Sequence, residues 1–168
     1  STNAGLWRYK IGDTIKFTSI SPYRIQITGR IKNHINVFGE ELMIENAEMA
    51  LSKASKVMDL DIVDYTAGPI FMKAGEKGAH QWLIEFKEPP NDTIKFTKLL
   101  DQFLKEVNSD YEAKRYKDIT LGMPIVNVAK KNLFYNWMAQ KNKLGGQHKV
   151  PRLSNHRDLL EELMKINR

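Results

Sequence analysis

The sequence predicts an α+β fold: an antiparallel or mixed sheet built in the order β-α-β-β-α-β, with helices packed on it and two extra helices at the C-terminal end. Three observations support this prediction. Short segments alternate apolar and polar residues, as half-buried strands do. Two longer segments repeat apolar residues every three or four positions, as amphipathic helices do. The strand and helix segments follow one another in the order of a split βαβ sandwich.

A β-hairpin near the N-terminus is predicted by two alternating segments. Residues 14–19 (TIKFTS) and 23–29 (YRIQITG) alternate apolar and polar side chains, so each can bury one face as a strand. The Ser-Pro pair at 21–22 lies between them and favours a turn. A further short strand is predicted around Ile35 and Val37.

Two amphipathic helices are predicted from their apolar stripes. The first spans residues 42–58, and the apolar residues on its buried face are Ala47, Ala50, Leu51, Ala54 and Met58. The second follows Asn91 or Asp92, because either side chain can accept a hydrogen bond from a free N–H of the first turn. Its stripe consists of Phe96, Leu99, Leu100, Phe103, Leu104 and Val107.

The remaining elements complete the β-α-β-β-α-β order. Strands are predicted at residues 60–66, 81–87 and 125–128, and helices near residues 131–142 and 155–166. The helix stripes are expected in the core, together with four aromatic residues: Trp82, Phe86, Phe103 and Trp137.

Charge is unevenly distributed along the chain. The net charge is +6, and residues 114–168 carry 12 basic and 4 acidic residues, so this segment supplies the whole excess. A basic segment suits a phosphate-bearing partner such as a nucleotide, a coenzyme or a nucleic acid, although a solvated surface has the same composition. Cysteine is absent, which excludes disulfides and thiolate metal sites. No apolar run approaches the roughly 20 residues of a membrane-spanning helix, so no membrane partner is expected.

No segment carries a self-sufficient catalytic constellation. The four histidines lack the i,i+4 spacing of a metal-binding helix, and there is no HExxH, GxSxG or Walker sequence, so no metal site is expected. Three other segments stand out together: Arg8–Asp13 (RYKIGD), Gly29–Leu42 (GRIKNHINVFGEEL) and Lys149–Arg152 (KVPR), which follows a glycine pair at 145–146.

In order and character, these three segments resemble the last conserved motifs of the adenylate-forming superfamily. Within it, the chain is most similar to the acyl-acid amido synthetases of the auxin-responsive-promoter family, and a bacterial member is expected. The residues that carry the closer resemblance are 4–13 (AGLWRYKIGD), 108–115 (NSDYEAKR) and 143–152 (KLGGQHKVPR). The resemblance spans nearly the whole chain.

This resemblance implies a domain division and a reaction. Residues 1–30 are the end of the large-domain motif, with the hairpin and the approach to a hinge, and residues 31–168 are the C-terminal lid domain. The parent protein is a cytoplasmic ligase that uses ATP and Mg²⁺ to adenylate a carboxylic acid and then joins the acyl group to an amino acid through an amide bond. The partner of the lid is the N-terminal adenylation domain of the same chain. The present chain lacks a signal-peptide pattern and is expected to be cut from this longer protein, and inactive by itself.

Four residues take roles by the same resemblance. Asp13 binds the ribose hydroxyls, since an ionised carboxylate only accepts hydrogen bonds, and Arg30 binds ribose or phosphate oxygens through its fork of donors. Lys32 falls at the hinge position. Lys149 is the catalytic lysine, whose ammonium reaches the α-phosphate and the carboxylate when the lid closes; the residue before it is His here, where the superfamily has Gly. Residues 108–115 are expected to shape the pocket for the acceptor amine.

The residues alone leave other functions open. A small basic α+β module that binds RNA has the same order of elements and a positive tail, but the Lys/Arg-Gly-Phe-aromatic strand that stacks bases is absent. A stand-alone interaction domain is a further alternative. An RNA-binding module would bind oligonucleotides with a steep salt dependence, whereas the lid domain is expected to have no nucleic-acid partner.

Overall fold

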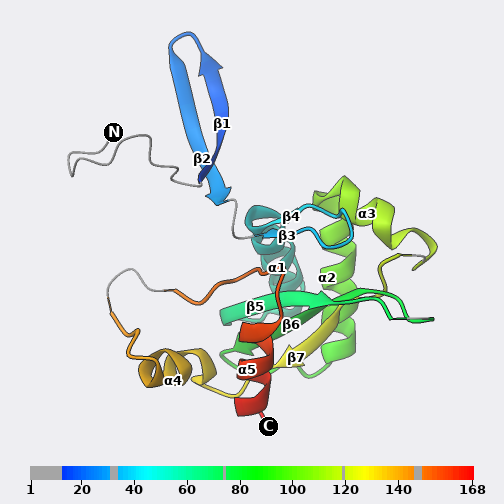
Figure 1. Ribbon diagram of the computed structural model, residues 1–168, viewed down its shortest axis with the longest axis vertical. Coiled ribbons are helices and arrows are strands. Elements are labelled where there is room, and N and C mark those ends of the chain that lie inside the picture. Colours follow the sequence, from blue (N-terminus) through cyan, green and yellow to red (C-terminus); the bar gives the residue numbers. More distant parts are fainter. Residues whose placement is uncertain (1–12, 31–33, 74, 119, 146–148) are drawn as a thin grey trace. The chain divides into compact units, whose positions relative to one another are not determined.

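The computed structural model divides the chain into two compact units, residues 1–32 and residues 33–168, each with its own fold (Figure 1). The residues that the structure describes are 13–30, 34–73, 75–118, 120–145 and 149–168. Within these ranges the first unit contains a β-hairpin and the second an α+β domain.

The hairpin of the first unit lies where the alternating sequence predicts it. β1 (Asp13–Ile20) and β2 (Tyr23–Arg30) pair in antiparallel fashion. Apolar side chains share one face of this ladder and are between 49% and 66% exposed. They form two cross-strand pairs, Ile15 with Ile27 and Phe17 with Ile25.

The second unit begins with a short ladder that closes a loop. β3 (His34–Ile35) pairs in antiparallel fashion with β4 (Leu42–Met43), and residues 36–41 turn back between them. The predicted strand in this region therefore ends at Ile35 and pairs with β4 rather than with the central sheet. Gly39 has a φ of 80°, a conformation that favours glycine and that lets the chain reverse here.

A three-stranded mixed sheet forms the centre of the second unit. β6 (Ala79–Phe86) pairs antiparallel with β5 (Ile62–Ile70) and parallel with β7 (Ile125–Val128). Leu153 adds a parallel bridge to Ala67 on the outer edge of β5. β5 and β6 extend further toward their connection than the sequence predicts, because their backbones remain paired there.

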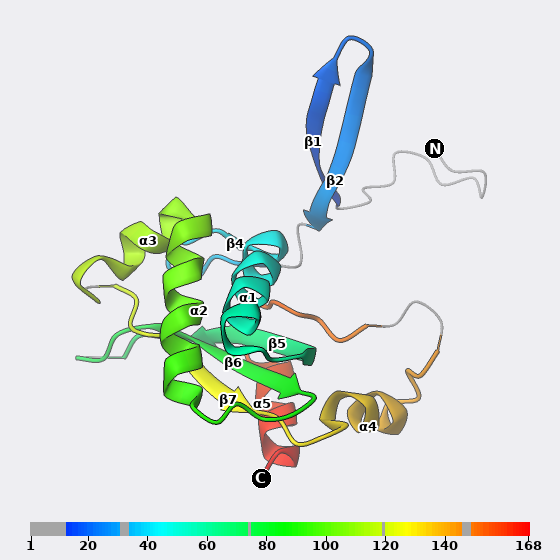
Figure 2. The same ribbon diagram turned by 180° about the vertical axis from the view of Figure 1, so that it is seen from behind.

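Helices cover both faces of this sheet (Figures 1 and 2). α1 (Ile44–Met58) and α2 (Thr93–Val107) lie on one face, and α4 (Leu133–Gln140) and α5 (Asp158–Ile166) lie on the other. All four helices are predicted by the sequence, and Asp92 caps α2 through its side chain. The pairs on opposite faces create two separate apolar cores.

Alternation along β6 assigns its side chains to these two cores. Trp82 packs in the core beneath α1 and α2, whereas the next residue, Leu83, packs in the core beneath α4 and α5. Of the four aromatic residues expected in the core, Trp82, Phe86 and Trp137 are buried, and Phe103 is only partly covered.

The sequence does not predict α3 (Ser109–Arg115), which follows α2 and leads into a 3-10 turn at Tyr116–Asp118. Asn108 caps α3 by accepting a hydrogen bond from the Tyr111 N–H at 2.8 Å. With seven residues, α3 is too short to show an apolar period.

The helices of the described ranges are short. The longest, α1 and α2, have 15 residues each. None in these ranges is long and apolar enough to cross a membrane.

Candidate functional site

Lys149, the lysine predicted to act on the nucleotide, lies at an open cleft of about 580 Å³. Its side chain is exposed, while the next residue, Val150, is buried in the core beneath α4 and α5. Asp64 of β5 and Arg152 line the same cleft. An exposed ammonium beside an open cleft is well placed to meet an anionic ligand.

The segment that follows this lysine is fixed to the outer edge of β5. The Ala67 N–H donates to the Arg152 carbonyl at 2.8 Å, and the Ser154 N–H donates to the Ala67 carbonyl at 3.1 Å. The Thr66 hydroxyl donates to the Pro151 carbonyl at 2.7 Å. The lysine therefore has a backbone held on its C-terminal side and a side chain that is free to reach a ligand.

Arg152 connects this segment to α1 and to β5. Its guanidinium pairs with Glu48 of α1, lies with Nε 3.8 Å from Oδ1 of Asp64, and stacks 5.1 Å from the centre of the Tyr65 ring. Burial raises the pKa of Asp64. The backbone N–H of Tyr65 and the positive charges of Arg152 and Lys149 lower this pKa, but they offset only part of the rise. Two cations thus lie near a carboxylate whose burial favours its protonated form.

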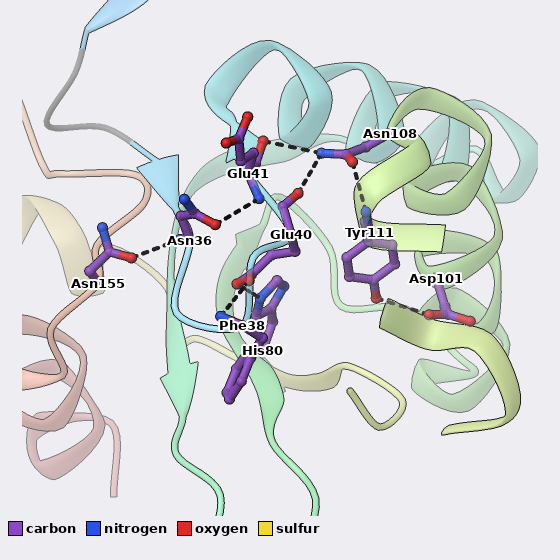
Figure 3. Close-up of polar contacts among 9 residues, drawn as sticks. All are labelled: Asn36, Phe38, Glu40, Glu41, His80, Asp101, Asn108, Tyr111 and Asn155. Atoms are coloured by element: carbon purple, nitrogen blue, oxygen red, sulfur yellow. Dashed lines mark hydrogen bonds and ion pairs between the residues drawn. The ribbon is translucent and has the colours of Figure 1, made fainter. Parts of the chain in front are cut away.

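A second group of polar residues holds the loop at residues 36–41 (Figure 3). Glu40 is buried, and its carboxylate accepts hydrogen bonds from Nε2 of His80 at 2.8 Å and from the Phe38 N–H at 2.7 Å. Burial by itself raises the pKa of Glu40, but the hydrogen bond and electrostatic interaction with His80 and backbone N–H groups lower this pKa by more. Glu40 therefore acts as the acceptor, and Nε2 of His80 as the donor.

Asparagine side chains tie the same loop to two further parts of the domain (Figure 3). The Asn36 N–H donates to Oδ1 of Asn155 at 2.8 Å, and Oδ1 of Asn36 accepts from the Glu41 N–H at 3.2 Å. Nδ2 of Asn108 donates to the carbonyls of Glu40 at 3.0 Å and Glu41 at 3.2 Å. The loop is thereby joined to α3 and to the segment before α5.

A third buried group joins α2 to α3. Asp101 accepts hydrogen bonds from the Tyr111 hydroxyl at 2.9 Å and from Nε of Arg115 at 2.6 Å, and pairs with Nζ of Lys105 at 2.8 Å. Burial raises the pKa of Asp101, but hydrogen bonds from Arg115 and Lys105 outweigh burial and hold this pKa below its ordinary value. In segment 108–115, expected to shape the pocket for the acceptor amine, Tyr111 and Arg115 thus make internal contacts.

The predicted site residues fall in different parts of the chain. Asp13 and Arg30 are cross-strand partners at the open end of the hairpin, so the fold brings their backbones together. Lys32 lies outside the described residues. Lys149 belongs to the second unit.

The sequence analysis assigns no role to Glu48 or Asp64, which Arg152 joins in the structure. For Asp64 a signal exists, because a carboxylate interrupts the apolar run of residues 62–67. For Glu48 there is none, because an acidic residue on the polar side of a helix is ordinary.

Solved structures share the fold of this chain. The fold is found within acyl acid amido synthetases: one structure titled "AtGH3.15 acyl acid amido synthetase in complex with 2,4-DB" matches 99% of this chain at 20% identity, with a TM-score of 0.71. A second, "GH3.15 acyl acid amido synthetase", matches 99% of the chain at 20% identity, with a TM-score of 0.75. The chain spans about a third of their length, 31% and 32% respectively.

The family follows from the sequence. The family model described as "GH3 family C-terminal domain" matches residues 45–158, and the one described as "GH3 family central domain" matches residues 1–30. The chain belongs to the GH3 family, which confirms the resemblance to acyl-acid amido synthetases and favours it over an RNA-binding module. A comparison with curated protein sequences finds no match.

Proposed function

We propose that this chain is the end of the large domain and the C-terminal lid domain of a cytoplasmic, ATP-dependent ligase that joins a carboxylic acid to an amino acid through an amide bond. The observation that carries the proposal is the position of Lys149 in a GH3-family chain. Its exposed ammonium lies at an open cleft, on a segment fixed to the edge of β5. The solved structures of the same fold, titled acyl acid amido synthetases, support this reaction class.

The reaction proceeds in two steps. A carboxylate oxygen attacks the α-phosphate of ATP, which forms an acyl-adenylate and releases pyrophosphate. The amine of an amino acid then attacks the acyl carbon, AMP leaves, and the amine loses a proton. The first step is needed because a carboxylate oxygen is a poor leaving group, whereas AMP is a good one. Negative charge builds at the α-phosphate in the first transition state, so preorganised cations lower the barrier.

Mg²⁺ supplies part of this charge neutralisation by binding phosphate oxygens. Within the described ranges, no group of three or more His, Cys, Asp or Glu is arranged to hold a metal ion. In the full-length protein, we assign the Mg²⁺ ligands to the phosphates of the nucleotide and to the N-terminal adenylation domain.

We assign further roles to residues of the first unit. Asp13 binds the ribose hydroxyls, and its cross-strand partner Arg30 binds ribose or phosphate oxygens. Lys32 is the hinge. The loop at residues 36–41 follows Lys32 in the chain, and its contacts with His80 and Asn108 join it to the rest of the second unit.

The apolar face of the hairpin supports a partner outside the present chain. Ile15, Phe17, Ile25 and Ile27 are about half exposed or more, and an isolated two-stranded hairpin is marginally stable at best in water. We assign this face to the N-terminal adenylation domain of the same protein, in agreement with the central-domain match at residues 1–30.

The decisive test is Lys149→Ala in the full-length protein. Carboxylate-dependent exchange of pyrophosphate into ATP should slow by about two to three decades, because removing one well-placed charge costs roughly 3–4 kcal/mol. Release of amide from a preformed acyl-adenylate should change far less, because the lid turns Lys149 away from the site between the two steps.

Lys143→Ala is the matched control. This lysine is also exposed and basic, but its Nζ lies 5.6 Å from the centre of the Trp137 ring and takes no part in the proposed chemistry. Its exchange rate should stay within about threefold of wild type. Exchange within the same range for Lys149→Ala would contradict the proposal.

A further inference from the structure

The side chain of Arg152 is held from three directions. Glu48 of α1 pairs with its guanidinium, the Tyr65 ring of β5 lies under it at 5.1 Å, and Oδ1 of Asp64 lies 3.8 Å from its Nε. The side chain is 37% exposed, so this contact group is partly shielded from water. We call Glu48, Asp64, Tyr65 and Arg152 the arginine clamp.

The backbone of Arg152 is fixed to the same strand. Its carbonyl accepts the Ala67 N–H at 2.8 Å, and the following Leu153 is fully buried and bridges Ala67. Side-chain and backbone contacts therefore act on one residue, and together they attach it to both α1 and β5.

This attachment controls the position of the Lys149 backbone. Lys149 lies three residues before Arg152, separated from it by the buried Val150 and by Pro151, whose ring restricts φ. A lysine side chain is flexible, so a fixed backbone limits the region that its ammonium can reach. The direction of the lysine thus depends on the segment that Arg152 holds.

We propose that Arg152 is a positioning residue that acts through Lys149: the arginine clamp fixes the segment from which the lysine reaches the α-phosphate. The inference rests on the proposed function. An arginine suits this position because its planar guanidinium stacks on Tyr65 and binds a carboxylate at its edge at the same time, which a lysine ammonium does not.

Loss of the clamp frees the segment from α1 and leaves only its backbone hydrogen bonds to β5, which then open more often. A displacement of about 1 Å at a reacting group costs up to about 100-fold in rate. In the full-length protein, Arg152→Ala should therefore lower the kcat of adenylation by about 10- to 100-fold, with a much smaller change in the KM for ATP. Arg152→Lys should recover less than half of this loss in log kcat, because lysine restores the charge but has no planar group to stack on Tyr65.

The double variant separates positioning from a general structural role. In a Lys149→Ala background, Arg152→Ala should lower adenylation by less than about twofold further, because the group through which it acts is gone. An equal loss in both backgrounds overturns the inference. Arg157→Ala is the matched control: this arginine also joins separate elements, through the Pro69 carbonyl at 2.7 Å and Gln81 at 2.9 Å, but does not hold the Lys149 segment. It should change adenylation by less than about threefold in either background.

Amide hydrogen exchange gives a readout that does not depend on activity. Arg152→Ala should speed exchange of the Ala67 and Ser154 amides by about tenfold or more, whereas Arg157→Ala should not. If these amides are unaffected by Arg152→Ala, the clamp does not hold the segment and the inference fails. If exchange responds but Lys149→Ala leaves adenylation unchanged, the role proposed for the lysine fails and the positioning role fails with it, while the clamp stands as a structural contact.

Discussion

Glu40 and Asp101 are both buried carboxylates, but they are held by different kinds of partner. Asp101 is bound by Arg115, which is always charged, and pairs with Lys105. Glu40 is bound by Nε2 of His80 and by the backbone N–H of Phe38. The other ring nitrogen of His80, Nδ1, has no hydrogen-bond partner in the described part of the chain. Asp101 thus has an arginine and a lysine as partners, whereas Glu40 has a histidine and a backbone N–H.

The two groups also connect different parts of the domain. Asp101 and Arg115 are 14 residues apart and join successive helices, whereas Glu40 and His80 are 40 residues apart and join a loop to the central sheet. This loop follows the proposed hinge. The α2–α3 pair therefore has the stronger polar attachment, and the loop at residues 36–41 is the easier part to release.

The largest effect is expected from Asp101→Ala. The variant removes a buried carboxylate that accepts hydrogen bonds from Tyr111 and Arg115 and pairs with Lys105, so the free energy of unfolding should fall by about 3–5 kcal/mol. Urea unfolding of the chain measures this loss. Asp110→Ala, an exposed acidic residue in the first turn of α3, is the control and should cost about 1 kcal/mol or less. If both variants lose the same free energy of unfolding, Asp101 contributes no more to stability than an exposed acidic residue.

His80→Phe should have a smaller effect, about 2–3 kcal/mol, because Glu40 loses one buried donor but keeps the backbone N–H. Adding Glu40→Gln to this variant should recover about 1 kcal/mol, since the amide oxygen still accepts the Phe38 N–H and no charge remains buried. Urea unfolding of the single and double variants measures both values. A double variant less stable than His80→Phe would show that Glu40 is not a charge held by the histidine.

Acid should weaken both attachments, because the pKa values of Glu40 and Asp101 are lowered in the fold from ordinary values of 4.5 and 3.8. As the pH falls, the unfolded carboxyls bind protons first. The stability that these groups provide is therefore complete above their ordinary pKa values and is lost as the pH falls through the lowered ones. Urea midpoints from neutral to acidic pH should fall less steeply in Glu40→Gln and Asp101→Asn than in wild type. If the urea midpoints of the variants fall in parallel with those of the wild type, neither carboxylate is the source of the acid sensitivity.

The smallest effect is expected at Asn108, which touches both groups. Asn108→Ser keeps a side-chain acceptor for the Tyr111 N–H but loses the donor to the carbonyls of Glu40 and Glu41, so it should cost about 1 kcal/mol. Hydrogen exchange should rise in the loop at residues 36–41 and stay unchanged in α3. Faster exchange in α3 as well would mean that the cap has been lost.

Much of the fold is predictable because its rules are local. The apolar stripes of α1 and α2, the alternation of β1 and β2 and the cap at Asp92 each depend on residues a few positions apart, and the structure confirms them. The pairings that the sequence leaves open share one feature. The parallel pairing of β6 with β7, the bridge at Leu153 and the pairing of β3 with β4 depend on which distant segments meet.

The same division holds for the candidate site. The family, the α+β class and the importance of Lys149 can be read from motifs and periods within short segments. Which polar groups share a buried environment depends on the tertiary structure. Glu48 and Arg152 are 104 residues apart and meet on the edge of a sheet, and no local pattern specifies such a contact, because its energy comes from the burial and orientation that the whole fold creates.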